Sequence, residues 1–365
     1  MVNSITNRQM VFILFLTLST VTLITMPKVM AETTGAGGWV TLVTLSVIFG
    51  ILAVVIVKLN NMFQGKVLFD YSRSLVGIVG SYIIAVFYII YFLGISIDLS
   101  SSLTNILKIN FIPKTPQGAT LFASLFICGY AAYKGITNVA RIFEIYGIIF
   151  LLAVVTVHIL MLFQGNLENI LPLYVPSQTG QYFAAMKDFV FPFLGIEVLT
   201  IIPFTAKNRK KSSKIAFLTL IGIGLIYVLV SESSIMMIGR NEIVHYQDAE
   251  ITAIRQVELP FIEFLRRIDI VYLIVGLMGL HAGITIVYTA IVEYVCRLFS
   301  RANRIIIVIG TGTIIFALGL IASDINSFGE IFKEYIIYFG LIAAAFIPIL
   351  LLIIAKVKKH AGKMV

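Results

Sequence analysis

Ten long apolar runs dominate this sequence and constrain its fold more than any other feature. A helix needs about 20 apolar residues to cross the hydrocarbon core of a bilayer, and most of the runs reach about that length. Charged residues make up only 12% of the chain, against roughly a quarter in soluble globular domains. We therefore predict an all-α polytopic membrane protein with ten transmembrane helices. The expected spans are 9–31, 38–60, 76–102, 118–134, 140–164, 183–205, 214–238, 269–298, 304–322 and 332–356.

No polar stretch is long enough for a separate soluble domain, so we expect residues 1–365 to form a single transmembrane domain. The apolar run from Met10 to Met26 is long for the core of a secretory signal peptide, and only Arg8 supplies positive charge before it. An uncleaved first helix is therefore expected, although Ala31 would suit a cleavage site.

Lysine and arginine are distributed unevenly between the two sides of these spans. Eighteen of the 27 basic residues fall in the two termini and in the connections that would share their side of the membrane. The positive-inside rule therefore places both termini in the cytoplasm, and it explains the net charge of +9 better than binding to nucleic acid does. The densest cluster, 206–214, is interpreted as a topology anchor, with an anionic-lipid site as the alternative.

The longest connection on the opposite side carries apolar residues at helical spacing among charged ones, over about 248–268. This pattern predicts an amphipathic helix, broken near Pro260, that lies on the outer surface. It would serve either as an interfacial cap on the bundle or as a lid over an outward-facing vestibule.

Ten spans divide into two halves of five, so the first and sixth occupy equivalent positions with opposite orientations. The first contains "LSTVTLITMP" (18–27) and the sixth "FLGIEVLTIIP" (193–203), each with a small or polar cluster before an apolar run that ends in proline. Interrupted helices at corresponding places in inverted repeats, here about 1–165 and 175–356, indicate a transporter-type binding site near mid-membrane. The alternative is that these glycines and prolines serve only helix packing.

Glu197 favours the binding-site interpretation. A carboxylate at the centre of a spanning helix costs about 2.5–3.5 kcal/mol on insertion scales, so it faces the bundle interior, a cavity or a partner. Three roles stay open: Glu197 accepts hydrogen bonds from a ligand, carries a coupling proton, or bonds unwound backbone N–H groups of the first span.

With these residues in view, the whole chain resembles the B-subunit family of spore nutrient-germinant receptors, which is similar to amino acid/polyamine/organocation permeases. The most specific patch is "FLGIEV" (193–198), with Pro203 and the basic loop after it. The supporting patches are "LITMP" (23–27), "GGWVTL" (37–42), "YFLG" (91–94), "ARIFEIY" (140–146), Asp324, "YIIYFG" (335–340) and Pro348.

The resemblance implies a LeuT-like fold, with ten spans in a 5+5 inverted repeat and discontinuous helices 1 and 6. It also implies a receptor subunit in the inner membrane of dormant spores, whose ligand is a small-molecule nutrient germinant such as an amino acid. The implied partners in germination are a larger membrane-bound A subunit and a lipoprotein C subunit.

One departure from that family lies in the first span, where many members have a glycine-containing stretch and this chain has Thr20, Val21 and Thr22. Glycine lets a ligand carboxylate approach bare backbone N–H groups, whereas threonine adds hydroxyls that donate to a ligand or to the i−4 carbonyl. Either the ligand is not an ordinary α-amino acid, or the threonine hydroxyls bind it.

The predicted ligand-binding site combines residues of the first, third, sixth and eighth spans. For His281, a side chain satisfied inside the bundle is a more common role than a ligand contact. The predicted site residues are Ser19, Thr20, Thr22, Tyr91, Gly94, Ile95, Phe193, Gly195, Ile196, Glu197, Gly279, His281, Ala282 and Gly283.

Neither catalysis nor a cofactor is expected. The four histidines are scattered, the two cysteines lie in apolar segments, and no phosphate loop or dinucleotide fingerprint is present. Three functions remain: a nutrient-sensing receptor subunit, an active amino-acid or organic-solute secondary transporter, and an ion or water conduit. The outer mouth of a conduit would be lined by Asp98, Glu232 and Asp324.

Overall fold

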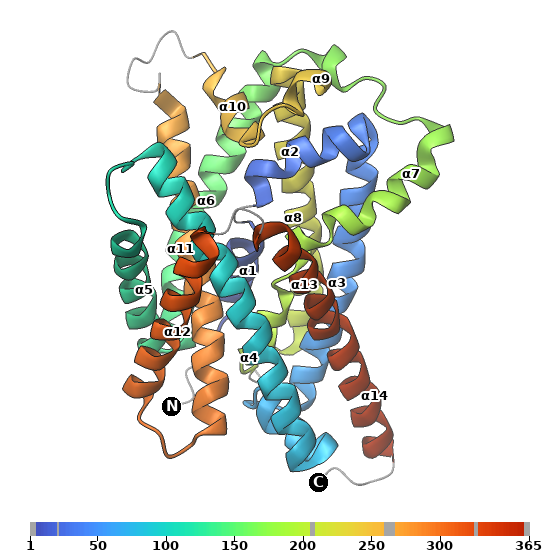
Figure 1. Cartoon of the computed structure of the whole chain (residues 1–365). Helices are drawn as coiled ribbons and strands as arrows, with labels where there is room; N and C mark the ends of the chain where they lie inside the picture. The colour runs from blue at the N-terminus through green and yellow to red at the C-terminus, as the bar shows by residue number, and fades with distance from the viewer. Residues whose placement is uncertain (1–4, 20–21, 205–208, 259–266, 325–327, 361–365) are drawn as a thin grey trace.

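The computed structural model describes residues 1–365 except 1–4, 20–21, 205–208, 259–266, 325–327 and 361–365. The described part is all helical and contains no strand (Figure 1). Within it, seven helices are long and apolar enough to cross a membrane, or up to eight if the bent pair α1 (Asn7–Leu18) and α2 (Thr22–Thr33) is one span. The prediction of an all-α multi-pass membrane protein is confirmed, and the count of ten spans stays a prediction.

The long helices gather into one bundle (Figure 1). The last of the seven spans, Phe332–Lys358, runs through α13, the π-helix η8 and α14. The helix α5 lies on the predicted fourth span but is not among the seven helices that are long and apolar enough to cross a membrane. The bounds are α3 (Gly38–Met62), α4 (Leu68–Asn110), α5 (Gln117–Lys134), α6 (Ile136–Gln164), α8 (Arg209–Ile238), α11 (Ile268–Leu298), α12 (Arg304–Asp324), α13 (Phe328–Leu341), η8 (Ile342–Phe346) and α14 (Ile347–His360).

The first predicted span is divided into α1 and α2. A capping box starts α1, because Thr6 Oγ1 accepts from the Gln9 N–H at 3.2 Å while the Gln9 side chain accepts from the Thr6 N–H at 3.0 Å. The axis of α2 is turned by 59° from that of α1. Pro27 lies inside α2 and does not end it. Although proline lacks the N–H for one backbone hydrogen bond, the helix continues to Thr33.

The longest helix, α4, has 43 residues and would measure about 64 Å at 1.5 Å per residue, twice the hydrocarbon thickness. It is not one straight rod, because Gly77 has φ 79° and ψ −178° and the chain kinks there. The predicted third span, 76–102, therefore begins at this kink.

The predicted sixth span is not a continuous α-helix but a series of 3₁₀ turns. The last turn ends before Pro203 because Ile202 has an extended conformation (φ −89°, ψ 115°), as residues before proline prefer. The elements of this stretch are α7 (Thr179–Ala184), η4 (Ala185–Phe189), η5 (Phe191–Phe193) and η6 (Ile196–Ile201).

The predicted amphipathic segment 248–268 contains a short helix, α10 (Ala249–Arg255), which follows α9 (Arg240–Ile243). Ile251 and Ile254 are fully buried, and α10 packs against α2, α8 and α11. The apolar side of this segment thus faces the bundle, while its residues 259–266, including Pro260, lie outside the described part.

Candidate functional site

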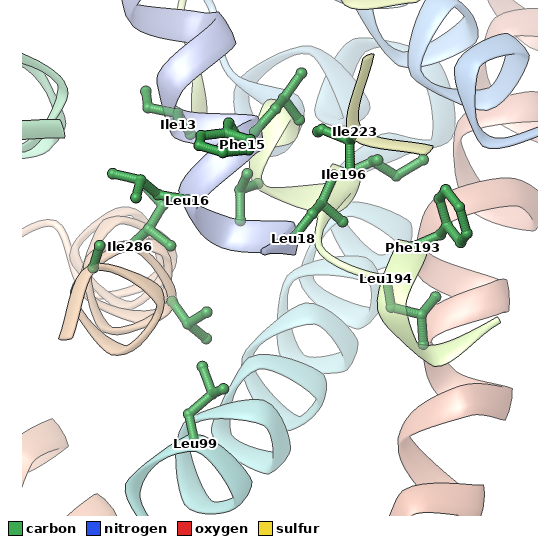
Figure 2. Packing of buried hydrophobic residues seen from close by; sticks show 14 of the residues in the cluster. Ile13, Phe15, Leu16, Leu18, Leu99, Phe193, Leu194, Ile196, Ile223 and Ile286 are labelled. Carbon is green, nitrogen blue, oxygen red and sulfur yellow. The ribbon is translucent and has the colours of Figure 1, made fainter. Parts of the chain in front are cut away.

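The interrupted first and sixth segments meet in the centre of the bundle. Figure 2 shows Leu18, at the end of α1, beside the stretch that carries Leu194 and Ile196. Gly195 has φ +125°, and a Cβ there would lie 2.9 Å from Cγ2 of Thr17 and 3.3 Å from Cδ2 of Leu18. Glycine is required at this junction both for its backbone conformation and for the close approach of α1.

One tyrosine binds both interruptions at once. The hydroxyl of Tyr227, on α8, lies 2.8 Å from the carbonyl oxygen of Leu18 and 2.8 Å from that of Pro192. Both carbonyls are at places where the helical hydrogen-bond pattern stops, so the hydroxyl replaces a missing backbone donor. Tyr227 therefore fixes the distance between the two interrupted segments.

Glu197 serves the backbone of its own segment. Its Oε2 accepts from the Gly195 N–H at 2.6 Å, its side chain is fully buried, and among the described residues Oε1 accepts no hydrogen bond. The buried hydroxyl of Tyr91 interacts electrostatically with this carboxylate. No described residue of the first span donates to Glu197, so of its three possible roles the structure displays a backbone acceptor, on the sixth segment and not on the first.

Side chains also form hydrogen bonds to the C-terminal part of the unwound stretch, at residues 199 and 200. Asn60 Nδ2 donates to the Leu199 carbonyl at 2.7 Å, and the Tyr71 hydroxyl orients that amide through Oδ1 at 2.6 Å. The Tyr294 hydroxyl donates to Thr200 Oγ1 at 3.0 Å. These contacts satisfy polar groups that unwinding exposes in an apolar interior.

A small cavity lies beside the junction, with about 40 Å³ available to the centres of water molecules. Its wall is apolar apart from three side chains. Thr17 Oγ1 already donates to the Ile13 carbonyl at 2.6 Å. Thr22 Oγ1 interacts with the Tyr227 hydroxyl but forms no hydrogen bond within 3.5 Å to a described residue, and Asp98 is the one charged group among the described lining residues. The lining residues are Thr17, Leu18, Thr22, Phe92, Ile95, Asp98, Leu99, Phe191, Pro192, Leu194, Gly195, Val198, Val287 and Ile336.

Three predicted site residues line this cavity: Thr22, Ile95 and Gly195. Six others surround the junction without lining it. Phe193 stacks on Phe49 with ring centroids 5.5 Å apart, and Gly94 faces Phe332 of α13. The remaining residues of this group, all buried, are Ser19, Tyr91, Ile196 and Glu197, and Thr20 lies outside the described residues.

The four predicted residues of α11 point elsewhere. Gly279 packs against Phe150 of α6, and the His281 ring bonds Ser124 of α5 at 3.2 Å and the Leu277 carbonyl at 2.9 Å. Ala282 and Gly283 are buried and are not among the lining residues. Among the described residues of α11, the one that lines the cavity is Val287, one turn closer to the C-terminus of the helix than Gly283.

Several lining residues were not predicted, and their signals in the sequence are weak. Phe92 and Leu99 lie at helical spacing from the predicted Ile95 on α4, a pattern equally typical of packing residues. Asp98 stands out as a carboxylate within a span, yet the sequence alone suggests for it only the outer mouth of a conduit. Phe191 and Val287 carry no distinguishing signal.

A second buried polar cluster lies next to α10. His158 Nδ1 is 2.8 Å from Ser233 Oγ, and its Nε2 is 3.2 Å from both Glu250 Oε1 and the Tyr272 hydroxyl, which itself donates to Glu250. These residues come from α6, α8, α10 and α11 and are buried. The cluster fastens α10 to the bundle, and nothing in the sequence pairs His158 with a residue 92 positions away.

Comparison with protein families gives a match over most of the chain. The model of a family described as "Spore germination protein" matches residues 4–328. Spore germination protein YndE of Bacillus subtilis (strain 168) is 24% identical over 369 residues, which cover 99% of both chains. Spore germination protein A2 of the same strain is 23% identical over 352 residues, covering 93% of this chain and 92% of its own.

Solved transporters share the fold at low sequence identity. MhsT in complex with L-phenylalanine has a TM-score of 0.68 at 17% identity, covering 94% of this chain and 87% of its own. Mhp1, a nucleobase-cation-symport-1 family transporter in a closed conformation with bromovinylhydantoin bound, has a TM-score of 0.63 at 14% identity, with 97% and 93% covered. The fold is therefore that of the LeuT-like transporters.

Proposed function

Because the chain belongs to the spore germination protein family, we propose that it is the nutrient-sensing B subunit of a spore germinant receptor. In this proposal a small nutrient, an amino acid or a molecule of similar size, occupies the cavity at the junction of the interrupted segments. Its binding signals to partner subunits and triggers germination. The observation that carries the proposal is that cavity, bounded by Thr22 on α2 and Gly195 on the sixth segment.

The proposal includes the finer architecture. Ten spans form a single domain with inverted repeats of five, where α5 supplies the fourth span and the turns between 185 and 201 supply the interrupted sixth. Both termini lie on the core side of the spore inner membrane. In support, the start of α1 and the end of α14 lie at the same end of the bundle (Figure 1).

A membrane-bound A subunit and a lipoprotein C subunit are the proposed partners, on the basis of the family resemblance. The size of the cavity suggests how binding would be transmitted. At about 40 Å³ it holds roughly three water molecules, so a nutrient fits only if the walls separate. A ligand that binds the expanded form shifts the population toward it, and Gly195, with its positive φ, offers a hinge.

Thermal stability of the purified full-length protein in nanodiscs, measured with amino acids, sugars and nucleosides, tests the proposal, because a ligand of the native state raises apparent stability. Ile95→Phe fills the cavity and is expected to abolish the shift given by the active nutrient. Ile90→Phe, on the exposed side of the same helix, is the matched control and should respond as wild type. Equal binding by the Ile95→Phe variant would show that the nutrient binds elsewhere.

The alternative function is active transport of an amino acid or organic solute. The observation that favours it is the fold, since the similar solved structures are transporters. Uptake into liposomes that contain only this protein distinguishes the two. Accumulation of the nutrient against a gradient would establish transport, and binding without uptake would support the receptor.

A further inference from the structure

Asp98 is unusual among the residues around the central cavity. It is the only charged side chain in the described lining, and it lies on α4 within the bundle, where a carboxylate is costly unless it meets a partner. Among the described residues, Asp98 forms no hydrogen bond, and no basic nitrogen lies within 4.0 Å of its oxygens. Its acceptor capacity is therefore unused by the residues that the structure describes.

Lys333 of α13 is the cation that acts on Asp98 from a distance. Its Nζ lies 5.6 Å from the ring centroid of Phe191, which lines the cavity, and its side chain is exposed. Lys333 thus stands at the rim of the cavity, held by a cation–π contact worth about 0.5–1 kcal/mol at an exposed site. It balances the charge of Asp98 without occupying the space beside it.

The described groups around the cavity suit a cation better than an anion. No lysine, arginine or histidine lines the wall. The N–H of Gly195, which unwinding would otherwise offer to a ligand carboxylate, is already bonded to Glu197 Oε2 at 2.6 Å. Thr22 Oγ1, which interacts with the Tyr227 hydroxyl, can accept a hydrogen bond from a ligand as well as donate one. The wall therefore offers acceptors and apolar surface to a ligand, and a positive group is the better complement.

We propose that the cavity recognises a protonated primary amine on a short apolar body, with the Asp98 carboxylate as its counter-ion and Lys333 as the resident competitor. This rests on the proposed function, in which the same cavity holds the nutrient. The ammonium of the ligand replaces the distant lysine with a close charge-assisted hydrogen bond. The apolar body contacts Phe92 and Val287, and a short body requires the least separation of the walls.

Three probes of similar shape test the charge requirement: isobutylamine, isobutanol and isobutyrate. L-Valine is the fourth probe and adds a carboxylate to the isobutylamine skeleton. Binding is measured by calorimetry on the full-length protein in nanodiscs. Isobutylamine is expected to bind, L-valine to bind more weakly because its carboxylate meets no free donor on the described wall, and isobutanol and isobutyrate not to bind. Tighter binding of isobutyrate than of isobutylamine would overturn the proposal.

Two variants test the roles of the charges. Asp98→Asn keeps the shape and should weaken isobutylamine binding by about tenfold or more, since a charge pair in a dry site is lost. Lys333→Gln should strengthen it severalfold, because the competitor is gone. Lys108→Gln, near the outer end of the same helix as Asp98, is the control and should change nothing. Unchanged binding in the Asp98→Asn variant would refute the assignment, as would weaker L-valine binding in the Lys333→Gln variant, which would make Lys333 a carboxylate ligand.

Two further probes distinguish a failure of this inference from a failure of the proposed function. D-glucose and inosine are added to the screen as nutrients without an alkyl amine. If either binds and isobutylamine does not, the amine assignment is wrong and the nutrient-sensing role stands. If no probe of any class binds the wild-type protein, while size-exclusion chromatography shows it folded, both are wrong.

Discussion

Replacing Gly195 by alanine tests the junction of the two interrupted segments. The backbone at this position has φ +125°, a conformation that costs a residue with a side chain about 1–3 kcal/mol. The added methyl group would also lie 2.9 Å from Cγ2 of Thr17, and overpacking of a buried contact costs about 1–3 kcal/mol more. We expect Gly195→Ala to lower the free energy of unfolding by about 2–6 kcal/mol.

A second substitution separates the two contributions. Thr17→Ser removes Cγ2 and keeps the Oγ1 hydrogen bond to the Ile13 carbonyl. In the double variant the steric part should be relieved and the backbone strain should remain, so stability recovers by about 1–3 kcal/mol relative to Gly195→Ala. Gly222→Ala is the control, because a Cβ there meets no atom within 4 Å.

The assay is unfolding of the full-length protein in mixed micelles with increasing SDS. The single tryptophan, Trp39, reports it through fluorescence, because its indole N–H donates to the Leu173 carbonyl at 2.9 Å in the folded state. Circular dichroism gives an independent transition. A Gly195→Ala variant as stable as Gly222→Ala would refute the geometry of the junction, and a double variant no more stable than Gly195→Ala would refute the contact with Thr17.

Three further predictions concern single polar groups. Tyr227→Phe leaves the Leu18 and Pro192 carbonyls without a donor and should destabilise the protein by about 1–3 kcal/mol in the same SDS titration; wild-type stability would contradict its bridging role. Glu250→Ala leaves His158 without its acidic partner and should cost about 3 kcal/mol, whereas the exposed Glu242→Ala should cost almost nothing; similar values for both would argue against the buried cluster. Thr22→Val removes a hydroxyl that interacts with the Tyr227 hydroxyl, so stability should fall by no more than about 0.5–1.5 kcal/mol while the nutrient concentration for half-maximal germination of spores rises about tenfold; an unaltered response would exclude Thr22 from the ligand contacts.

Part of the site could be predicted because local chemistry determines it. Gly195 takes up a positive φ at little cost, and Pro192 and Pro203 flank it, so the break in the sixth segment can be inferred from its own residues. The break after Leu18 contains no glycine and Pro27 does not end α2, so it is inferred from its polar residues and from its corresponding position in the first half. That these breaks meet follows from counting spans in two halves. The role of Glu197 could not be predicted, because its acceptor oxygen reaches Gly195, two residues back on its own segment, only in the conformation that the break adopts.

The long-range hydrogen bonds between helices also could not be predicted from the sequence. Tyr227 bonds Leu18, 209 positions away, and His158 bonds Glu250, 92 positions away. Neither the tyrosine nor the histidine stands in a motif that distinguishes it from other polar residues in apolar helices. Such partners are decided by the rotation of each helix about its own axis.

The sequence by itself determined that this chain is a bundle of apolar helices with two interruptions, because backbone polar groups in hydrocarbon must be bonded within the segment and only helices of sufficient length achieve that. Only the tertiary structure decided which side of each helix faces the cavity. In α3, Ile51 is 54% exposed and Ile56 is fully buried, yet both are isoleucine. Lipid is as apolar as the protein core, so hydrophobicity does not distinguish the two sides, and packing alone placed Asp98 and Val287 at the cavity.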